Sequence, residues 1–460
     1  MLDSNASACA PKPGVFRDRL LALLRRLQIS PGVALAVAQR VWPALVGPIS
    51  FMLLTLFLNA GQMGFYGAFQ GMLGFQSVFD LGLGVLMINL ASHEWPQLKL
   101  DAQGNLSGEP EALGRLKSLH DVVLRWAGLA SLLFVLTIGV VGYVLFSQKN
   151  QPGWHAAWLT LIILAGLNLW LQPLTALLEC CQQVTTVWAF RLVAAVAGTL
   201  AAWLVLIFHG GLWALSANAA ALLLANVFLL FVRYKNFFRS LQSAAPAHAE
   251  HWRIEIWPMQ WRLVLQSFAG YLGFGLFTLV IFHYHGEEEG GRMAMSWAIV
   301  STLGLVALAW LQPRIPTFGA LIAQRDFAAL DHLFKRVSLT SLGLLSLASV
   351  LVWVAVWLLN QWQYPQATRL IPPLPLALFL AANLLMHVSQ CLSAYLRAHK
   401  REVLMPMGVT ASLICGLLVF VLGRKEGVTG VGAGFLIVVA GVIIPWQTVI
   451  WHRCRAAWHK

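Results

Sequence analysis

Charged residues are scarce in this 460-residue chain, and acidic residues are the scarcest. Only 11% of the residues are Asp, Glu, Lys or Arg, with 18 acids against 31 bases, whereas 59% are hydrophobic. A soluble globular domain carries about twice that share of charged residues. The composition therefore excludes an ordinary soluble protein and predicts an all-α polytopic membrane protein.

The motifs of several chemistries are also missing. No CxxC pair occurs among the six cysteines, so the sequence indicates neither a zinc site nor a redox pair. The phosphate-binding pattern GxxxxGK(S/T) is absent, so no ATP-driven motor is encoded in this chain. His283, His285 and His387 lack ligand spacing to other His, Cys or acidic residues, and we interpret them as hydrogen-bonded polar groups. We therefore expect no metal and no other cofactor.

Long hydrophobic runs are abundant instead. About 20 mostly apolar residues cross the roughly 30 Å hydrocarbon core of a bilayer. We predict about twelve transmembrane helices, at residues 41–60, 65–92, 122–146, 156–178, 188–208, 212–232, 262–283, 293–313, 338–359, 371–393, 404–422 and 429–450. An even number of spans places both termini on the same side of the membrane.

The lysines and arginines orient these spans. With both termini in the cytoplasm, 26 of the 31 basic residues lie on the cytoplasmic side, and the other five are Lys149, Arg292, Arg369, Arg424 and Lys425. Cytoplasmic segments carry the excess of positive charge in membrane proteins. The distribution predicts cytoplasmic N and C termini, and it explains the net charge of +13 without nucleic acid as a partner.

The predicted spans form two pseudo-symmetric six-helix bundles. The short amphipathic segment 15–29 carries leucines on one face and arginines mostly off it, as expected of a helix on the membrane surface. Spans five and eleven each end in a glycine turn that opens the next helix, so we predict two parallel repeats. The expected parts are a cytoplasmic N-terminal region at 1–39, a bundle at 40–232, a cytoplasmic linker at 233–261, a bundle at 262–450 and a cytoplasmic tail at 451–460.

One acid stands in the middle of the second predicted span. Asp80 is followed by Leu81-Gly82-Leu83-Gly84 within the apolar stretch 65–95. A carboxylate at this depth costs at least about 2.5 kcal/mol on insertion scales, so it should face protein or a water-filled cavity rather than lipid. Two interpretations remain open at this point: an acid that bonds a neighbouring helix, or a residue that lines a transport path.

Several short motifs resemble one family. They are Tyr66-Gly67, the run Asp80 to Gly84, the segment Trp310 to Pro316 with Ala323 to Phe327 after it, and the segment Ala394 to Lys400. In this order they are similar to the Wzx-like O-antigen and capsule flippases, the polysaccharide-transporter branch of the MOP superfamily and relatives of the MATE drug exporters. The resemblance covers nearly all of residues 40–450.

This resemblance implies a MATE-like fold in which two six-helix bundles alternate between inward-open and outward-open states. It implies a bacterial inner-membrane protein that flips an undecaprenyl-pyrophosphate-linked oligosaccharide for O-antigen, capsule or exopolysaccharide synthesis. The expected partners are this lipid-linked oligosaccharide, membrane lipids, a polysaccharide polymerase and chain-length proteins. The coupling ion, H⁺ or Na⁺, stays open.

Five further charged residues join Asp80 as candidates for the substrate site or cavity: Arg40, Arg262, Arg191, Arg314 and Glu179. Guanidinium groups bind phosphate oxygens through strong, often bidentate hydrogen bonds. Arg40 and Arg262 occupy equivalent positions in the two halves, so we expect them to approach each other at the cytoplasmic mouth. Arginine at a cytoplasmic span end is also what the topology alone requires.

Two other functions compete with the flippase. A MATE-like, ion-coupled exporter of small cationic molecules would use acids in its cavity, and few acids, Asp80 and Glu179 among them, lie within or at the edge of the predicted spans. A membrane-integrated glycan polymerase or ligase would place catalytic residues in a large outer loop, and the predicted outer loops are short. We therefore expect no enzyme activity.

Overall fold

The computed structural model describes residues 31–101, 103–149, 151–245, 252–399 and 403–458. The amphipathic helix predicted at 15–29 lies outside these residues. The described chain is almost entirely helical, with one short β-hairpin, which confirms the prediction of an all-α polytopic fold. We call residues 31–245 the N-lobe and residues 252–458 the C-lobe.

The N-lobe begins with a long helix and continues with a helix that is broken twice. Its elements, in chain order, are α2 (Pro31–Phe57), α3 (Ala60–Leu73), α4 (Gln76–Phe79), α5 (Leu83–Glu94), the 3₁₀ turn η1 (Trp95–Gln97), β1 (Leu98–Leu100), β2 (Leu106–Gly108), α6 (Pro110–Ser147), α7 (Trp154–Leu178), the π-helical turn η2 (Glu179–Gln183), α8 (Val184–Ile207), α9 (Trp213–Val227), the π-helical turn η3 (Phe228–Arg233) and α10 (Lys235–Ser243).

The C-lobe contains fewer irregular segments. Its elements are α11 (Trp252–Phe274), α12 (Phe277–His285), α13 (Glu287–Leu311), the 3₁₀ turn η4 (Gln312–Arg314), α14 (Ile315–Ala323), α15 (Phe327–Gln361), the 3₁₀ turn η5 (Pro365–Arg369), α16 (Pro373–Ala398), α17 (Met405–Val438), the π-helical turn η6 (Val439–Ile443) and α18 (Ile444–Trp458).

Seven described helices are long and apolar enough to cross a membrane, or eight if the bent pair α11–α12 is one span. Two of the seven are 54-residue runs, Trp154–Ile207 and Met405–Trp458, and each contains a break. Gln182 and Gly427 have positive φ at these breaks. The chain reverses at both breaks: Arg191 contacts Glu179 across the first, and Gly434 packs against Leu418 across the second. Each run therefore supplies two antiparallel segments, as predicted for 156–178 with 188–208 and for 404–422 with 429–450.

The second predicted span differs from the expectation of one continuous helix over 65–92. The helix starts earlier, at Ala60, because Asn59 and Gln62 form a capping box at its N-terminus. It then breaks twice, at Gly74 and at residues 80–82. Leu81 and Gly82 both have positive φ, so the chain cannot continue as an α-helix there. Hydropathy cannot detect such a break, because the residues on both sides are apolar.

The N-lobe is held together by aromatic packing and by indole hydrogen bonds. Phe65, Phe69, Phe146 and Trp158 are fully buried and contact one another at ring-centroid distances of 4.9–6.1 Å. Trp42 donates to the Thr199 hydroxyl at 3.1 Å, and Trp203 donates to the Ser50 hydroxyl at 2.9 Å; both bonds join α2 to α8. In a bilayer, this packing and these bonds replace the hydrophobic drive that folds soluble bundles.

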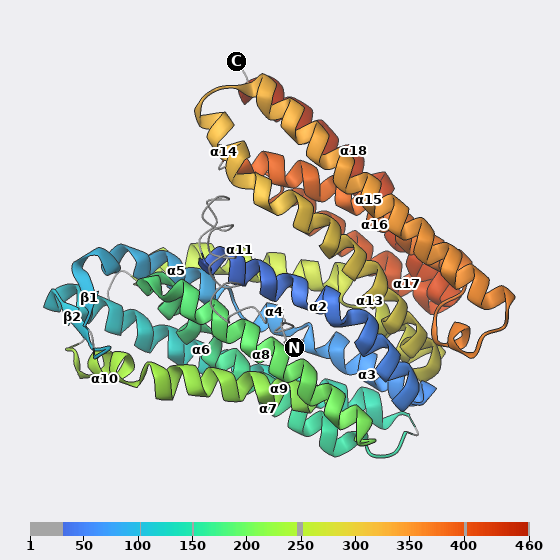
Figure 1. Cartoon of the computed structure of the whole chain (residues 1–460), viewed down its shortest axis with the longest axis horizontal. Helices are drawn as coiled ribbons and strands as arrows, with labels where there is room; N and C mark the ends of the chain where they lie inside the picture. The colour runs from blue at the N-terminus through green and yellow to red at the C-terminus, as the bar shows by residue number, and fades with distance from the viewer. Residues whose placement is uncertain (1–30, 102, 150, 246–251, 400–402, 459–460) are drawn as a thin grey trace, which may run out of the picture.

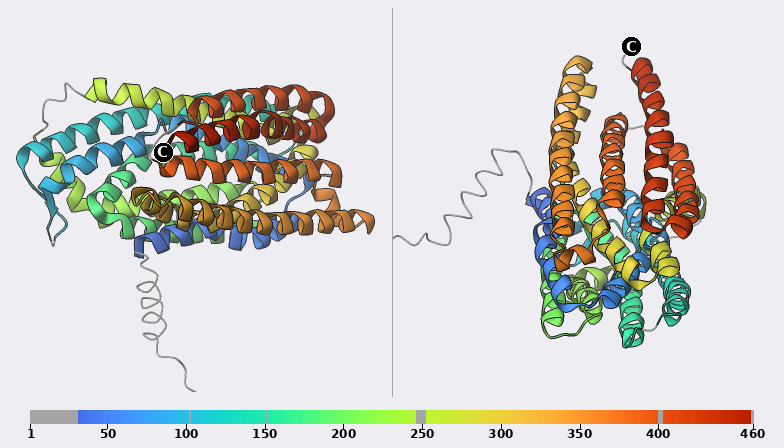
Figure 2. Two further views of the ribbon diagram at one scale, coloured as in Figure 1. Left: turned by 90° about the horizontal axis from the view of Figure 1, so that it is seen from above. Right: turned by 90° about the vertical axis from the view of Figure 1, so that its right-hand side faces the viewer.

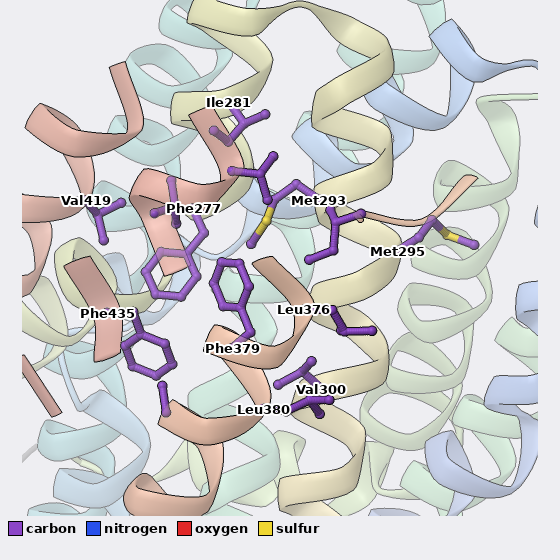
Figure 3. Packing of buried hydrophobic residues seen from close by; sticks show 14 of the residues in the cluster. Phe277, Ile281, Met293, Met295, Val300, Leu376, Phe379, Leu380, Val419 and Phe435 are labelled. Atoms are coloured by element: carbon purple, nitrogen blue, oxygen red, sulfur yellow. The ribbon is translucent and has the colours of Figure 1, made fainter. Parts of the chain in front are cut away.

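The core of the C-lobe is also aromatic (Figure 3). Phe277 from α12, Phe379 from α16 and Phe435 from α17 turn their rings toward one another, at centroid distances of 5.2–6.4 Å. Met293 and Val300 of α13 lie against this group. The cluster joins the two ends of the C-lobe chain, so α12, α13, α16 and α17 form one packed unit.

The two lobes meet at one end of the molecule and diverge toward the other (Figure 1). They meet where α3 and α13 run side by side. The far end of the N-lobe carries β1–β2 and α10, and the far end of the C-lobe carries α14 and the C-terminus. Seen from the side in Figure 2, the orange and red helices of the C-lobe lie over the blue and green helices of the N-lobe. We call the end where α3 meets α13 the closed end.

Candidate functional site

A cavity of about 790 Å³ lies inside the N-lobe. It lies within the range of about 300–1,000 Å³ that is usual for small-ligand sites. Seven of its lining residues carry side-chain amides, which is a large polar share for the interior of a membrane bundle. The polar lining residues are Gln39, Gln70, Gln76, Asn168, Gln172, Thr175, Arg191, Asn218 and Asn226, and the others are Leu73, Gly74, Leu161, Ala165, Leu169, Ala194, Ala195, Leu215, Ala219 and Leu222.

Helical periodicity brings these amides onto one surface. On α7, Asn168, Gln172 and Thr175 follow at spacings of four and three residues, which places them on a single face. On α9, Asn218 and Asn226 are two turns apart and share a face in the same way. These amides are hard to predict from the sequence, because none of them is unusual alone. A polar stripe along two otherwise apolar spans is the signal that could have found them.

Part of this amide surface is held by the protein and part is open. Asn168 donates to the Ala219 carbonyl at 3.0 Å and accepts a bond of 3.1 Å from the Asn226 amide, which links α7 to α9. By contrast, the amides of Gln70, Gln172 and Asn218 are exposed and have no hydrogen-bond partner among the described residues. An amide offers both donors and acceptors. These three side chains can therefore bind a ligand without breaking an existing contact.

Two of the predicted site residues meet at the cavity. Arg191 lines it, and its Nη2 lies 2.5 Å from Oε1 of Glu179. The same nitrogen lies 3.2 Å from the Thr175 hydroxyl, and the guanidinium lies over the Trp188 ring at 4.8 Å. Glu179 is only 15% exposed, so it is well placed to neutralise the arginine. The described lining contains no carboxylate, and its one cation is paired.

Asp80 lies elsewhere in the N-lobe. It follows α4 at the second break of the second span, and it is not among the described lining residues of the cavity. Its side chain is half-buried, and its Oδ1 atom is fully buried without a hydrogen-bond partner among the described residues. Gln76, one turn earlier, does line the cavity. Asp80 therefore lies one helical turn after a lining residue, with one buried oxygen that has no partner among the described residues.

The remaining predicted arginines are at surfaces or outside the described side chains. Arg314 is exposed in η4, and Arg262 is exposed on α11 beside the Trp261 ring, 5.6 Å from its centroid. Arg40 lies on α2, and its side chain is not among those described. The approach of Arg40 to Arg262 thus stays a prediction. Among the described residues, no group of three or more His, Cys, Asp or Glu could hold a metal ion.

At the closed end, α3 presents glycines to the C-lobe. A Cβ atom on Gly64 would overlap the carbonyl oxygen of Glu287, and one on Gly67 would overlap the Cβ of Ala294. On the opposite helix, a Cβ on Gly291 would lie 2.8 Å from the backbone nitrogen of Gly64. Glycine allows two membrane helices to approach this closely. The contact between α3 and α13, which we call the seam, therefore requires its glycines.

No protein-family model and no curated protein sequence matches the chain. Solved structures do match its fold. A MATE family multidrug transporter of the MOP superfamily in an inward-facing conformation superposes with a TM-score of 0.58 at 12% identity, over 92% of this chain and 96% of that one. The chain has the MATE fold. The MATE multidrug transporter DinF-BH, solved in complex with a ligand, gives a TM-score of 0.56 at 13% identity, over 95% and 97% of the two chains.

A third match is a MOP superfamily transporter from Pyrococcus furiosus, described as having a binding pocket of reverse polarity. Its TM-score is 0.52 at 13% identity, over 94% of this chain and 97% of that one. All three matched proteins are transporters rather than enzymes. The three matches cover 92–95% of this chain, so the shared fold extends over both lobes.

Proposed function

We propose that the chain is a membrane transporter that moves its cargo by rocking the N-lobe against the C-lobe. The MATE fold and the two lobes that meet at one end support this proposal. The basic residues predict that the divergent end, with α10, α14 and the C-terminus, faces the cytoplasm of a bacterial inner membrane. In that orientation the structure is inward-facing, with the seam closing the outer side.

We propose a lipid-linked oligosaccharide as the cargo. The observation that carries this proposal is the amide-lined cavity, whose one cation is neutralised by Glu179. Sugar hydroxyls both donate and accept hydrogen bonds, and so do the open amides of Gln70, Gln172 and Asn218. A cationic cargo would find no unpaired carboxylate among the described lining residues. The cavity therefore suits a neutral, hydroxyl-rich group better than a cationic drug.

One observation favours a second function, a MATE-like, ion-coupled exporter of small molecules. The buried Oδ1 atom of Asp80, which has no hydrogen-bond partner among the described residues, could hold a proton or a cation. The match to the multidrug transporter DinF-BH agrees with this alternative at the level of fold. An ion-driven flippase would use Asp80 in the same way. The cargo, rather than the ion site, separates the two functions.

The deciding experiment compares cargoes in proteoliposomes. The purified protein is reconstituted with a fluorescent undecaprenyl-pyrophosphate oligosaccharide, and the fraction that becomes accessible to an external glycosidase is measured over time. We expect accelerated appearance in the opposite leaflet, and a slower rate in Gln172→Met, which keeps the side-chain length and removes the amide. Gln361→Met, an exposed amide at the end of α15, is the matched control. Uptake of a small cationic dye with no movement of the lipid would establish the exporter instead.

A further inference from the structure

One C-lobe tyrosine is built into the N-lobe. Tyr271 of α11 is only 6% exposed, and it belongs to a buried cluster whose other members are almost all N-lobe residues. Leu279 and Phe282, both on α12, are the cluster's other described C-lobe members that are buried. Of these three side chains, Tyr271 alone carries a polar group.

The tyrosine contacts the N-lobe at the first break of its second span. The Tyr271 hydroxyl donates to the carbonyl of Gly71 at 2.9 Å, which joins the two lobes by a hydrogen bond. Its ring lies against Phe75, with 3.7 Å between the ring centroids. A Cβ atom on Gly74 would lie 2.9 Å from the tyrosine ring, so this glycine leaves the space that the ring fills.

The same ring fills the break in its own span. Helices α11 and α12 meet at a bend of 47°. Gly275 lies at this bend, its amide donates to the Tyr271 carbonyl at 2.7 Å, and a Cβ on it would overlap the Tyr271 ring. Two broken spans, one in each lobe, thus share one side chain at their breaks. Sharp helix bends need such a local cause, and here both bends pack on Tyr271.

The segment that holds the tyrosine also forms the cavity wall. Gln70, Leu73, Gly74 and Gln76 line the cavity, while the Gly71 carbonyl between them accepts the Tyr271 bond. A shift of this segment changes both the cavity and the joint between the lobes. The contact is therefore located where a rocking motion has to rearrange it.

We propose that Tyr271 is the latch that holds the two lobes in the arrangement seen here. It acts as a positioning residue: its hydroxyl ties the N-lobe break to the C-lobe break, and rocking to the outward-open state requires this bond to be released. The inference concerns the joint between the lobes and does not depend on which cargo is carried. Loss of the bond should favour the state in which the seam is open.

The test measures the seam without any ligand. Spin labels are placed at two exposed residues, Gln148 directly after α6 of the N-lobe and Gln361 at the end of α15 of the C-lobe, with the native cysteines replaced. Pulsed dipolar spectroscopy in nanodiscs then reports the label-to-label distance. In Tyr271→Phe the ring is kept, and the Gly71 carbonyl keeps its 3.1 Å bond from the Gly74 amide, so the protein should fold. We expect the ratio of long to short distances to rise about fivefold, equivalent to the roughly 1 kcal/mol of one hydrogen bond.

Two companion variants keep the test decisive. Gly74→Ala pushes the ring from its place and should lengthen the distance in the same direction. Tyr284→Phe, an exposed tyrosine on α12, should leave the distribution unchanged. An unchanged distribution in Tyr271→Phe overturns the proposal, and so does an equal shift in Tyr284→Phe. A lower melting temperature of Tyr271→Phe without any long-distance population would make Tyr271 a packing residue only.

Discussion

Arg191 and Glu179 lie on opposite sides of a chain reversal, with 2.5 Å between Nη2 and Oε1. The reversal at Gln182 brings the first turns of α8 back toward the end of α7, so Arg191 of α8 meets Glu179 directly after α7. This pair decides the electrostatic character of the N-lobe cavity. With it intact, the described lining has no net charge, which is why we assign a neutral group of the cargo to the cavity.

Breaking the pair of Arg191 and Glu179 should destabilise the protein. Glu179→Gln leaves the partly buried Arg191 without its ion-pair partner, so we expect the free energy of unfolding to fall by about 1–3 kcal/mol. This is less than the roughly 3–5 kcal/mol typical of fully buried pairs, because water that enters the cavity can solvate the guanidinium. The melting temperature in detergent measures this loss. The double variant Glu179→Gln with Arg191→Gln should recover most of it. If the single and double variants melt together, the two residues are not coupled.

The glycine seam gives a second prediction. Gly64→Ala places a methyl group where the Glu287 carbonyl lies, so α3 and α13 must separate. Overpacking of this kind costs about 1–3 kcal/mol. It destabilises the closed arrangement of the seam relative to the open one and leaves the packing within each lobe unchanged. We expect a longer distance between labels at Gln148 and Gln361 with little change in melting temperature. Gly47→Ala in α2 is the matched control, because nothing lies within 4 Å of its added Cβ. An unchanged distance would show that the seam is not a gate.

Features that depend on local sequence are predictable, whereas contacts between distant segments are not. Spans such as 156–178 and 188–208 depend on local hydropathy, which a bilayer imposes directly, and they were predicted closely. The pairing of Glu179 with Arg191 depends on the reversal between those spans, so both residues were found but their contact was not. The Gly64 contact and the Tyr271 bond join separate lobes. No local pattern encodes which surfaces meet across such a distance.

Asp80 gives a third prediction, which concerns coupling. Asp80→Asn keeps the shape of the side chain and removes its charge, and the buried Oδ1 atom has no partner to lose among the described residues. We expect near-normal protein levels together with impaired export, because the site for a proton or a cation is gone. The rate in proteoliposomes is compared under an imposed pH gradient and under a Na⁺ gradient. Asp326→Asn, an N-cap at the start of α15, serves as the control. If Asp80→Asn exports at the normal rate, Asp80 contributes to helix packing and not to coupling.

The last prediction concerns the predicted cytoplasmic mouth, where we expect Arg40 on α2 and Arg262 on α11 to occupy equivalent positions in the two halves. If they bind the pyrophosphate of the cargo, the planar guanidinium matters, because lysine offers no two-pronged donor. If they only orient the chain, lysine suffices, because topology counts either residue. We therefore expect Arg40→Lys and Arg262→Lys to insert at normal abundance and to lower the rate of lipid movement. Arg453→Lys in the C-terminal tail is the control. A normal rate in both variants would move the search for the phosphate contact to Arg191, the described cation nearest the amides of the cavity.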